Sequence, residues 1–198
     1  MNSRRIPCLL CGVVALSLSL VGRAVPATTS DTKESAASAR RDGQHDFDFE
    51  IGTWKTKVSR LQHPLSGSTA WVDYEGTTVV RPIMGGRANL AELDIAGKAG
   101  AVQGVSLRLY NPLTHEWSLN YASLRDGALG PPPVGGFVQG RGEFIGHDTL
   151  EGRPILVRFV IVCATSSTCR FEQAFSADGG KAWEVNWVAT DTRIEGGT

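Results

Sequence analysis

The residue types most often used for chemistry are sparse and scattered in this chain. The four histidines, His45, His63, His115 and His147, lie far apart, and none has the paired spacing of a metal site. The sequence has no Gly-x-Ser-x-Gly nucleophile elbow and no phosphate-binding loop. The sequence therefore predicts no metal site, no catalytic residue and no cofactor.

The acidic residues do not form a recognisable catalytic pair either. Glu92, Glu143 and Glu172 could face the interior of a β structure. General acid–base catalysis requires such groups at a defined mutual distance, and strand parity alone cannot bring two of them together. His115 shares strand parity with Trp117 and Tyr121, but it lies beside a turn, where a solvated histidine is the common outcome.

Cys163 and Cys169 flank a five-residue loop between two strand-like runs. Two strand ends that face each other across a short loop bring Cβ atoms near the distance of a disulfide, about 3.8 Å. Cys163 and Cys169 do not have the Cys-x-x-Cys spacing of redox sites. We expect a structural disulfide.

The stretch from Ser176 to Trp183 matches the Asp-box pattern of sialidase propellers. In that pattern an aspartate caps a hairpin turn and a tryptophan packs beneath it. A propeller requires several blades, and this chain has a single copy. The stretch therefore predicts a turn without chemistry of its own.

The N-terminus has the order of a secretory signal peptide. Arg4 and Arg5 precede an apolar run from Ile6 to Val21, and small residues at Val25 and Ala27 fit a cleavage site after Ala27. The apolar run is short for a membrane span. The sequence predicts export to the periplasm or the exterior, without a permanent membrane anchor.

The predicted organisation is a signal peptide at 1–27, a disordered tether at 28–44 and one domain at 45–198. The tether is polar and has no aromatic residue, so it cannot bury enough apolar surface to fold. Cleavage would remove Arg4, Arg5 and Arg23 and no acid, which leaves a slightly acidic chain without a basic stripe. Nucleic acid is therefore not an expected partner.

The domain has the pattern of an all-β protein. Short runs alternate apolar and polar residues, and turn residues separate them. About nine strands are predicted, at 54–61, 69–80, 87–95, 103–110, 115–123, 137–145, 154–163, 169–176 and 181–193, with one long irregular loop at 127–136. Meander connections without helical crossovers predict an antiparallel barrel or sandwich.

Gly52 and Trp54 stand at the head of the first predicted strand, and Arg193 stands near the end of the last. The glycine permits a tight turn into the strand, and the tryptophan is a large flat side chain that can close one end of a barrel. A guanidinium stacked on the indole would join the first and last strands. We expect these three residues to close the barrel.

These residues resemble the calycin superfamily of lipocalins, fatty-acid-binding proteins and nitrobindins. The stretches 110–117 and 175–187 are similar to a bacterial lipocalin-like domain family of unknown function, over residues 45–193. The resemblance implies a calycin-like barrel of about 8–10 strands that holds a small molecule. Nitrobindins hold haem through a histidine near the C-terminal end of the barrel, but residues 183–193 here contain none.

We therefore predict an exported small-molecule-binding barrel with a mostly apolar ligand. The alternatives are an isomerase- or cyclase-type enzyme that uses the same cavity, and a structural or interaction protein with a filled barrel. From strand parity relative to Arg193, Trp183, Val185 and Trp187 should face inward. The predicted ligand-binding residues are Trp117, Leu119, Tyr121, Glu143, Gln173 and Trp187, and the rest of the wall is assigned to Phe137, Ile155, Val157, Phe159, Phe171 and Phe175.

Overall fold

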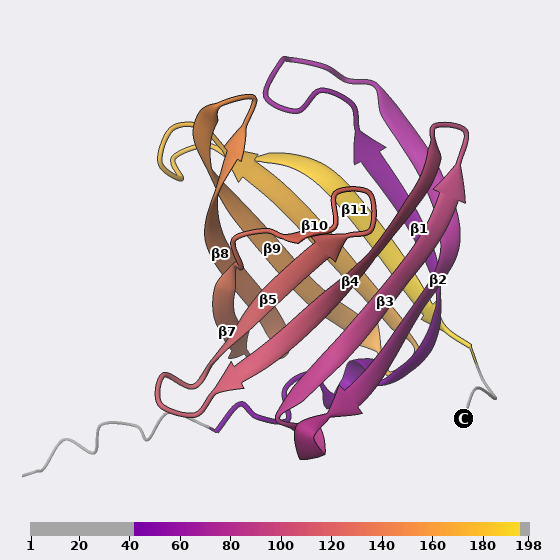
Figure 1. Cartoon of the computed structure of the whole chain (residues 1–198), viewed down its shortest axis with the longest axis vertical. Coiled ribbons are helices and arrows are strands. Elements are labelled where there is room, and N and C mark those ends of the chain that lie inside the picture. Colours follow the sequence, from indigo (N-terminus) through magenta and orange to yellow (C-terminus); the bar gives the residue numbers. More distant parts are fainter. Residues whose placement is uncertain (1–41, 195–198) are drawn as a thin grey trace, which may run out of the picture. The chain divides into compact units, whose positions relative to one another are not determined.

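The computed structural model describes residues 42–194, which form an antiparallel β-barrel with ten strands in its wall (Figure 1). The eleven strands are β1 Gly52–Leu61, β2 Trp71–Ile83, β3 Ala88–Gly97, β4 Gly100–Asn111, β5 Glu116–Ser123, β6 Ala128–Leu129, β7 Val134–Val138, β8 Arg141–Leu150, β9 Arg153–Thr165, β10 Thr168–Ser176 and β11 Glu184–Arg193. Two 3-10 turns, η1 Asp48–Glu50 and η2 Met84–Gly86, are the only helical elements of the described residues. The predicted signal peptide and residues 28–41 of the predicted tether lie outside this range.

The strands follow a meander that closes on itself. The order around the barrel is β4-β3-β2-β1-β11-β10-β9-β8-β7-β5, and β4 also pairs with β5. The first and last strands are joined in register, with Trp54 opposite Arg193. Because the barrel is closed, none of its long strands has an unpaired edge, and this stabilises the single sheet. The prediction of an antiparallel barrel is confirmed.

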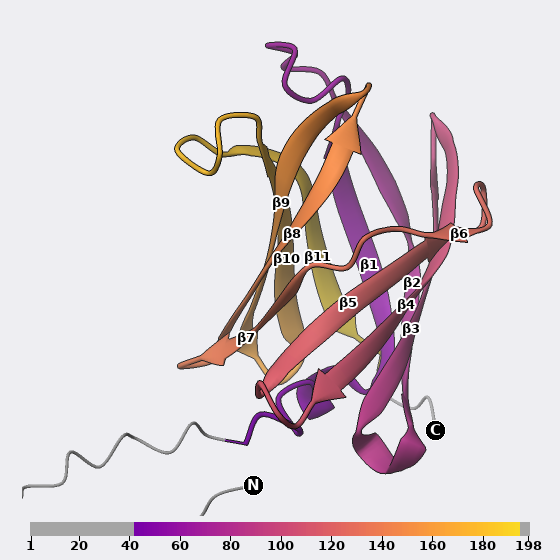
Figure 2. The same ribbon diagram turned by 60° about the vertical axis from the view of Figure 1, so that its left-hand side comes forward.

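Two predicted elements on one side of the barrel were wrong in detail. The predicted strand 137–145 is two strands, β7 and β8, because Gln139 and Gly140 both have positive φ and reverse the chain between them. The predicted loop 127–136 contains β6 and the start of β7, and it runs back alongside β5 (Figure 2). It hydrogen-bonds to β5 through Gly130 and Pro133, so it completes the wall where β7 is too short.

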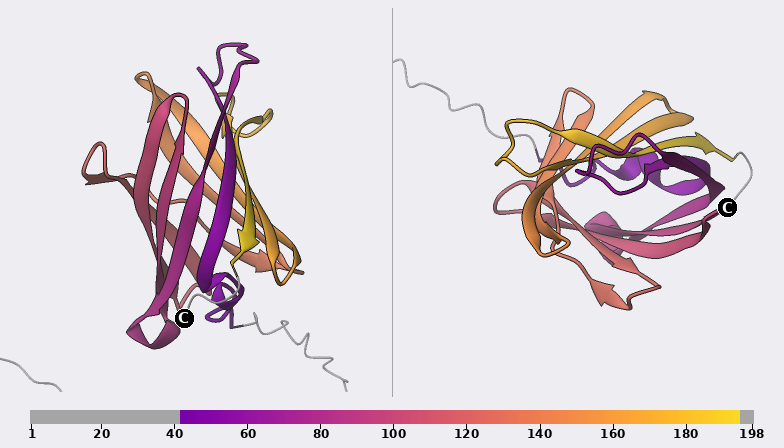
Figure 3. Two further views of the ribbon diagram at one scale, coloured as in Figure 1. Left: turned by 90° about the vertical axis from the view of Figure 1, so that its right-hand side faces the viewer. Right: turned by 90° about the horizontal axis from the view of Figure 1, so that it is seen from above.

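The segment before β1 crosses one end of the barrel (Figure 3). Two residues that face each other on β4 and β5, Tyr110 and Trp117, hold the start of this segment. The Trp117 indole donates a hydrogen bond to the carbonyl of Gly43 at 2.8 Å, and the Gly43 amide donates to the Tyr110 hydroxyl at 3.2 Å. We call this the closed end of the barrel.

The predicted disulfide between Cys163 and Cys169 is confirmed. The two cysteines face each other on β9 and β10, and Cys169 is buried in the hydrophobic core. The bond therefore joins neighbouring strands from the interior side of the barrel, near the closed end. Among residues 42–194, no helix has the length and apolar character needed to cross a bilayer.

Candidate functional site

The barrel encloses a cavity of about 930 Å³. Its wall is made by apolar side chains from both halves of the sheet, namely Val58, Tyr74, Ala91, Leu93, Leu119, Val157, Phe159, Phe171, Trp187 and Ala189. At the end away from η1, exposed and charged residues line it, among them Arg60, Arg125 and Asp148. The cavity therefore opens to solvent at that end and is shut at the other.

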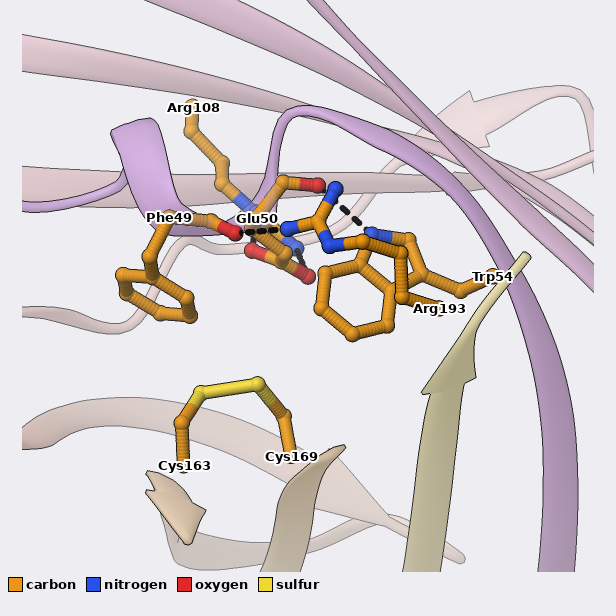
Figure 4. Close-up of polar contacts among 7 residues, drawn as sticks. All are labelled: Phe49, Glu50, Trp54, Arg108, Cys163, Cys169 and Arg193. Atoms are coloured by element: carbon orange, nitrogen blue, oxygen red, sulfur yellow. Dashed lines mark hydrogen bonds and ion pairs between the residues drawn. A yellow bond between two sulfur atoms is a disulfide. The ribbon is translucent and has the colours of Figure 1, made fainter. Parts of the chain in front are cut away.

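At the other end Arg193 stacks on Trp54 (Figure 4), and Gly52 lies beside the same guanidinium. The guanidinium carbon lies 4.1 Å from the Trp54 ring centre, and Nη1 and Nη2 donate to the carbonyls of Ile51 and Phe49. Gly52 has φ +132°, and a Cβ at this position would lie 2.6 Å from Arg193 Nη1. Only glycine allows both this backbone conformation and this approach of the guanidinium.

Phe47 plugs the closed end from inside. Its ring is 1% exposed and meets Trp117 and Phe137 edge to face, with ring centres 5.1 Å and 5.0 Å apart. Edge-to-face pairs of this kind add stability beyond the area that they bury. The plug separates the cavity from solvent and fixes η1 in place.

A buried ion pair lies between Phe47 and the cavity. Arg108 on β4 donates to both carboxylate oxygens of Glu50 on η1, with Nη2 and Oε1 3.0 Å apart, and both residues line the cavity. The two side chains are 7% and 2% exposed. Such a bidentate pair fixes geometry strongly, although its net contribution to stability is small because both charges lose their water.

Asp191 on β11 is the third ionisable group at this level. It is 4% exposed and lines the cavity, and its Oδ1 has no hydrogen-bond partner among the described residues. Burial raises the pKa of Asp191 to about 7 and the Glu50 carboxylate acts in the same direction, while a hydrogen bond from Thr56 and the charge of Arg108 oppose the shift. Asp191 therefore changes its charge near neutral pH.

Thr56 and Thr78 complete a polar layer that we call the floor of the cavity: Glu50, Thr56, Thr78, Arg108 and Asp191. The two hydroxyl oxygens are 2.6 Å apart, and both threonines are buried. Polar and charged groups thus lie at both ends of the cavity, and most side chains of the wall between them are apolar. This arrangement can orient an elongated molecule with one polar end.

Four of the six predicted ligand-binding residues line the cavity: Leu119, Tyr121, Gln173 and Trp187. Trp117 is buried but lies in the closed end against Phe47, outside the cavity lining. Glu143 is outside the cavity as well. Its carboxylate pairs with Arg141 at 2.9 Å, and its side chain is 43% exposed, because the strand alternation of β8 directs it outward.

The wider prediction of the wall was right in part. Val157, Phe159 and Phe171 line the cavity, whereas Phe137 belongs to the closed end, and Ile155 and Phe175 are not in the lining. Trp183 and Val185 do not line it either. A β-bulge opposite Gln173 and Ala174 skips Asn186, so the alternation of β11 is interrupted before it reaches these two residues.

Trp183 belongs to the Asp-box turn between β10 and β11, which has the predicted turn role. Asp178 Oδ1 accepts hydrogen bonds from the Ala182 amide at 3.0 Å, the Ser176 hydroxyl at 2.8 Å and the Lys181 amide at 3.0 Å, and these bonds hold the pKa of Asp178 below its usual range. The Trp183 ring lies under the guanidinium of Arg158 at 4.5 Å. The turn stands outside the cavity.

Sequence reasoning missed most of the floor, including Glu50, Arg108 and Asp191. A signal for Asp191 was present, because the parity that places Arg193 inward places Asp191 inward as well. No comparable signal marked Arg108. Within the described residues, no group of three or more His, Cys, Asp or Glu side chains could hold a metal ion.

No protein-family model and no curated protein sequence matches the chain. Among solved structures, it is similar to the S-type phycobiliprotein lyase from Guillardia theta, with 11% identity and a TM-score of 0.52 over 79% of this chain and 94% of that chain. It also matches a redesigned β-barrel bound to DFHBI, with 12% identity and a TM-score of 0.41 over 73% of this chain and 99% of that chain. The first likeness shows the fold alone, a calycin-like barrel. Membership of the bacterial lipocalin-like domain family stays a prediction.

Proposed function

We propose that this protein is exported and binds a small molecule inside its barrel. The observation that carries the proposal is the cavity of about 930 Å³, which has an apolar wall and a polar floor. Small-molecule sites typically have volumes of about 300–1,000 Å³, mostly apolar linings and a few polar groups that orient the ligand. The ligand is accordingly apolar over most of its length, as the sequence suggested, but has a polar end.

Side chains between the floor and the open end of the cavity fit this role. Trp187 and Phe159 offer flat apolar surfaces, and Gln173 lines the cavity next to them. Tyr121 lies against Gly104, where a Cβ would come 2.3 Å from the tyrosine hydroxyl, so the wall accommodates its ring. Burial raises the pKa of Tyr121, which keeps its hydroxyl neutral and able to donate a hydrogen bond.

Binding is tested with N-phenyl-1-naphthylamine, a neutral probe that fluoresces in apolar surroundings. We expect saturable binding of one probe per chain. Ala189→Phe places an aromatic ring inside the cavity and should weaken binding of the probe, whereas Thr190→Phe, the neighbouring exposed position on β11, should not. Equal binding to both variants would refute the cavity as the site, provided that circular dichroism shows both folded.

Tryptophan fluorescence gives an independent measure. Energy transfer to the bound probe should weaken in Trp187→Phe, because this indole lines the cavity. Trp71→Phe is the matched control, since Trp71 lies 43% exposed on β2. Equal transfer in wild type and Trp187→Phe would place the probe elsewhere.

The proposed export rests on the order of basic, apolar and small residues at 1–27 and fits the disulfide, because disulfides persist mainly in oxidising compartments. N-terminal sequencing of protein from its own host should begin near Thr28. A product that retains Met1 in the cytoplasmic fraction would overturn export and leave ligand binding untouched.

A second candidate function is proton-transfer catalysis in the same cavity. It is favoured by Asp191, because a carboxyl group whose pKa is about 7 can act as general acid or base at neutral pH. The molecules that co-purify with wild type and with Asp191→Asn should be compared by chromatography and mass spectrometry. An enzyme gives product from wild type and its isomeric substrate from the variant, whereas a binder gives the same molecule from both or loses it in the variant.

A further inference from the structure

The floor of the cavity contains an acceptor that the fold leaves unsatisfied. Asp191 is 4% exposed, yet its Oδ1 has no partner in the described part of the chain. Thr56 stands directly across from it on β1, and both residues line the cavity. Leaving a buried polar atom unpaired is costly, so such an atom in a folded protein calls for a specific explanation.

The only cationic side chain of the floor, Arg108, is already paired with a carboxylate of the protein. Both terminal nitrogens of Arg108 donate to Glu50, and the guanidinium carbon lies 4.6 Å from the ring centre of Phe47. Because the guanidinium of Arg108 is paired with one carboxylate and packed on an aromatic ring, it has little capacity to bind a second carboxylate from a ligand. The floor therefore disfavours a ligand whose polar end is an anion.

The charge balance of the floor points in the same direction. Glu50 from η1 and Arg108 from β4 neutralise each other, and they are the charged groups that act on Asp191. Ionised Asp191 thus leaves one negative charge in excess. A positive group in the ligand would remove this excess and fill the vacant acceptor at once.

We propose that the floor recognises a cationic N–H donor, such as a primary ammonium group at one end of an apolar ligand, with Asp191 as its acceptor. This inference rests on the proposed function, because it places the ligand in the same cavity. The ammonium has three N–H donors, which suit Asp191 Oδ1 and the hydroxyl oxygens of Thr56 and Thr78. The apolar remainder would lie along Leu119, Phe159 and Trp187.

Binding of the ammonium is coupled to loss of a proton from Asp191. Burial raises the pKa of Asp191 to about 7, so below that pH the carboxyl is neutral in the empty cavity. The ammonium favours the carboxylate, so the O–H bond of Asp191 breaks and its proton passes to the buffer. The ligand keeps all of its own protons, and no electrons are transferred.

The test uses three probes with the same chain, decylamine as its ammonium form, 1-decanol and decanoate, measured by isothermal titration calorimetry. We expect decylamine to bind at least about tenfold more tightly than decanoate, with decanol between them. At pH 6, titrations in buffers of different ionisation enthalpy should show release of about one proton per decylamine, and at pH 8.5 about none.

Two variants assign the effect. Asp191→Asn should weaken decylamine binding at least about tenfold and abolish proton release, while decanol binding changes less than about threefold. Asp94→Asn, an exposed position on β3, should match wild type in every titration.

Failure of this inference is distinct from failure of the proposed function. If all three probes bind and decanoate equals or exceeds decylamine, or if decylamine releases no proton at pH 6, the donor assignment is wrong and the cavity stands as the site. If none of the probes and no N-phenyl-1-naphthylamine binds, the proposed function falls, and this inference falls with it.

Discussion

Asp191→Asn should make the protein more stable above neutral pH. An aspartate that moves from an ordinary pKa of 3.8 in the unfolded chain to about 7 in the barrel opposes ionisation in the folded state. Between these two values the folded chain binds more protons than the unfolded chain, so stability falls as pH rises through this window and levels off above it. Asparagine keeps the shape of the side chain and removes the titration.

The magnitude follows from the size of the shift. About three pKa units, at about 1.4 kcal/mol each, give a destabilisation of about 4 kcal/mol well above pH 7. About 2–3 kcal/mol of this develops between pH 5 and pH 8, since part of the change is complete by pH 5. A domain of this size has a total stability of about 5–15 kcal/mol, so the effect is large enough to measure.

The assay is urea denaturation followed by tryptophan fluorescence at pH 5 and pH 8. We expect the free energy of unfolding of wild type to fall by about 2–3 kcal/mol more between the two pH values than that of Asp191→Asn. Asp94→Asn removes an exposed carboxylate from β3 and should keep the pH slope of wild type. An Asp191→Asn variant with the wild-type slope would show that this carboxyl is not the group that titrates.

Three further changes test the closed end. Arg193→Ala should lower the free energy of unfolding by about 2–4 kcal/mol, because it removes the cation–π contact with Trp54 and three hydrogen bonds from a charged donor. In the same urea titration, Arg170→Ala on the exposed face of β10 should cost at most about 1 kcal/mol, and equal midpoints for the two variants would refute closure by Arg193. Arg108→Met should lower the free energy of unfolding by about 3–5 kcal/mol, because it leaves the Glu50 carboxylate buried without its partner. Adding Glu50→Gln to this variant should recover a large part of the loss. A double variant no more stable than Arg108→Met alone would contradict the ion-pair argument. Alkylation without reductant should label neither cysteine of the disulfide, and replacing both by alanine should cost roughly 2 kcal/mol in thermal denaturation; rapid labelling of native protein would count against the bond.

The barrel could be predicted from a few residues with strong local constraints. Gly52, Trp54 and Arg193 indicated which strands meet, since each residue type has one obvious use at a barrel end. The failures were at places without such a constraint. Gln139 adopts φ 51°, a conformation that its residue type does not signal, so one predicted strand became two.

The floor was harder to predict because it breaks the rule that identifies inward faces. On β4, Leu107 and Leu109 alternate with Ser106 and Arg108, and the usual pattern would place the leucines inside. The structure does the opposite: Ser106 and Arg108 line the cavity, and Leu109 is 43% exposed. The same face of β4 carries Val102 and Tyr110, which pack against the core. Burial of Arg108 on this face depends on Glu50, which is distant in sequence, so no local pattern of β4 predicts it.

This reversal bears on what the cavity is for. Burying a leucine contributes about 1.5–3 kcal/mol, whereas a buried ion pair gives little or no net stability. Packing alone would therefore favour the leucines of β4 inside, and it would not leave Asp191 Oδ1 unpaired or hold its carboxyl at a pKa of about 7. Departures of this kind that stabilise nothing in the empty barrel are expected at functional sites. Under the proposed function the polar floor serves recognition of a ligand, and the stability gained by Asp191→Asn at high pH would measure what that recognition costs the fold.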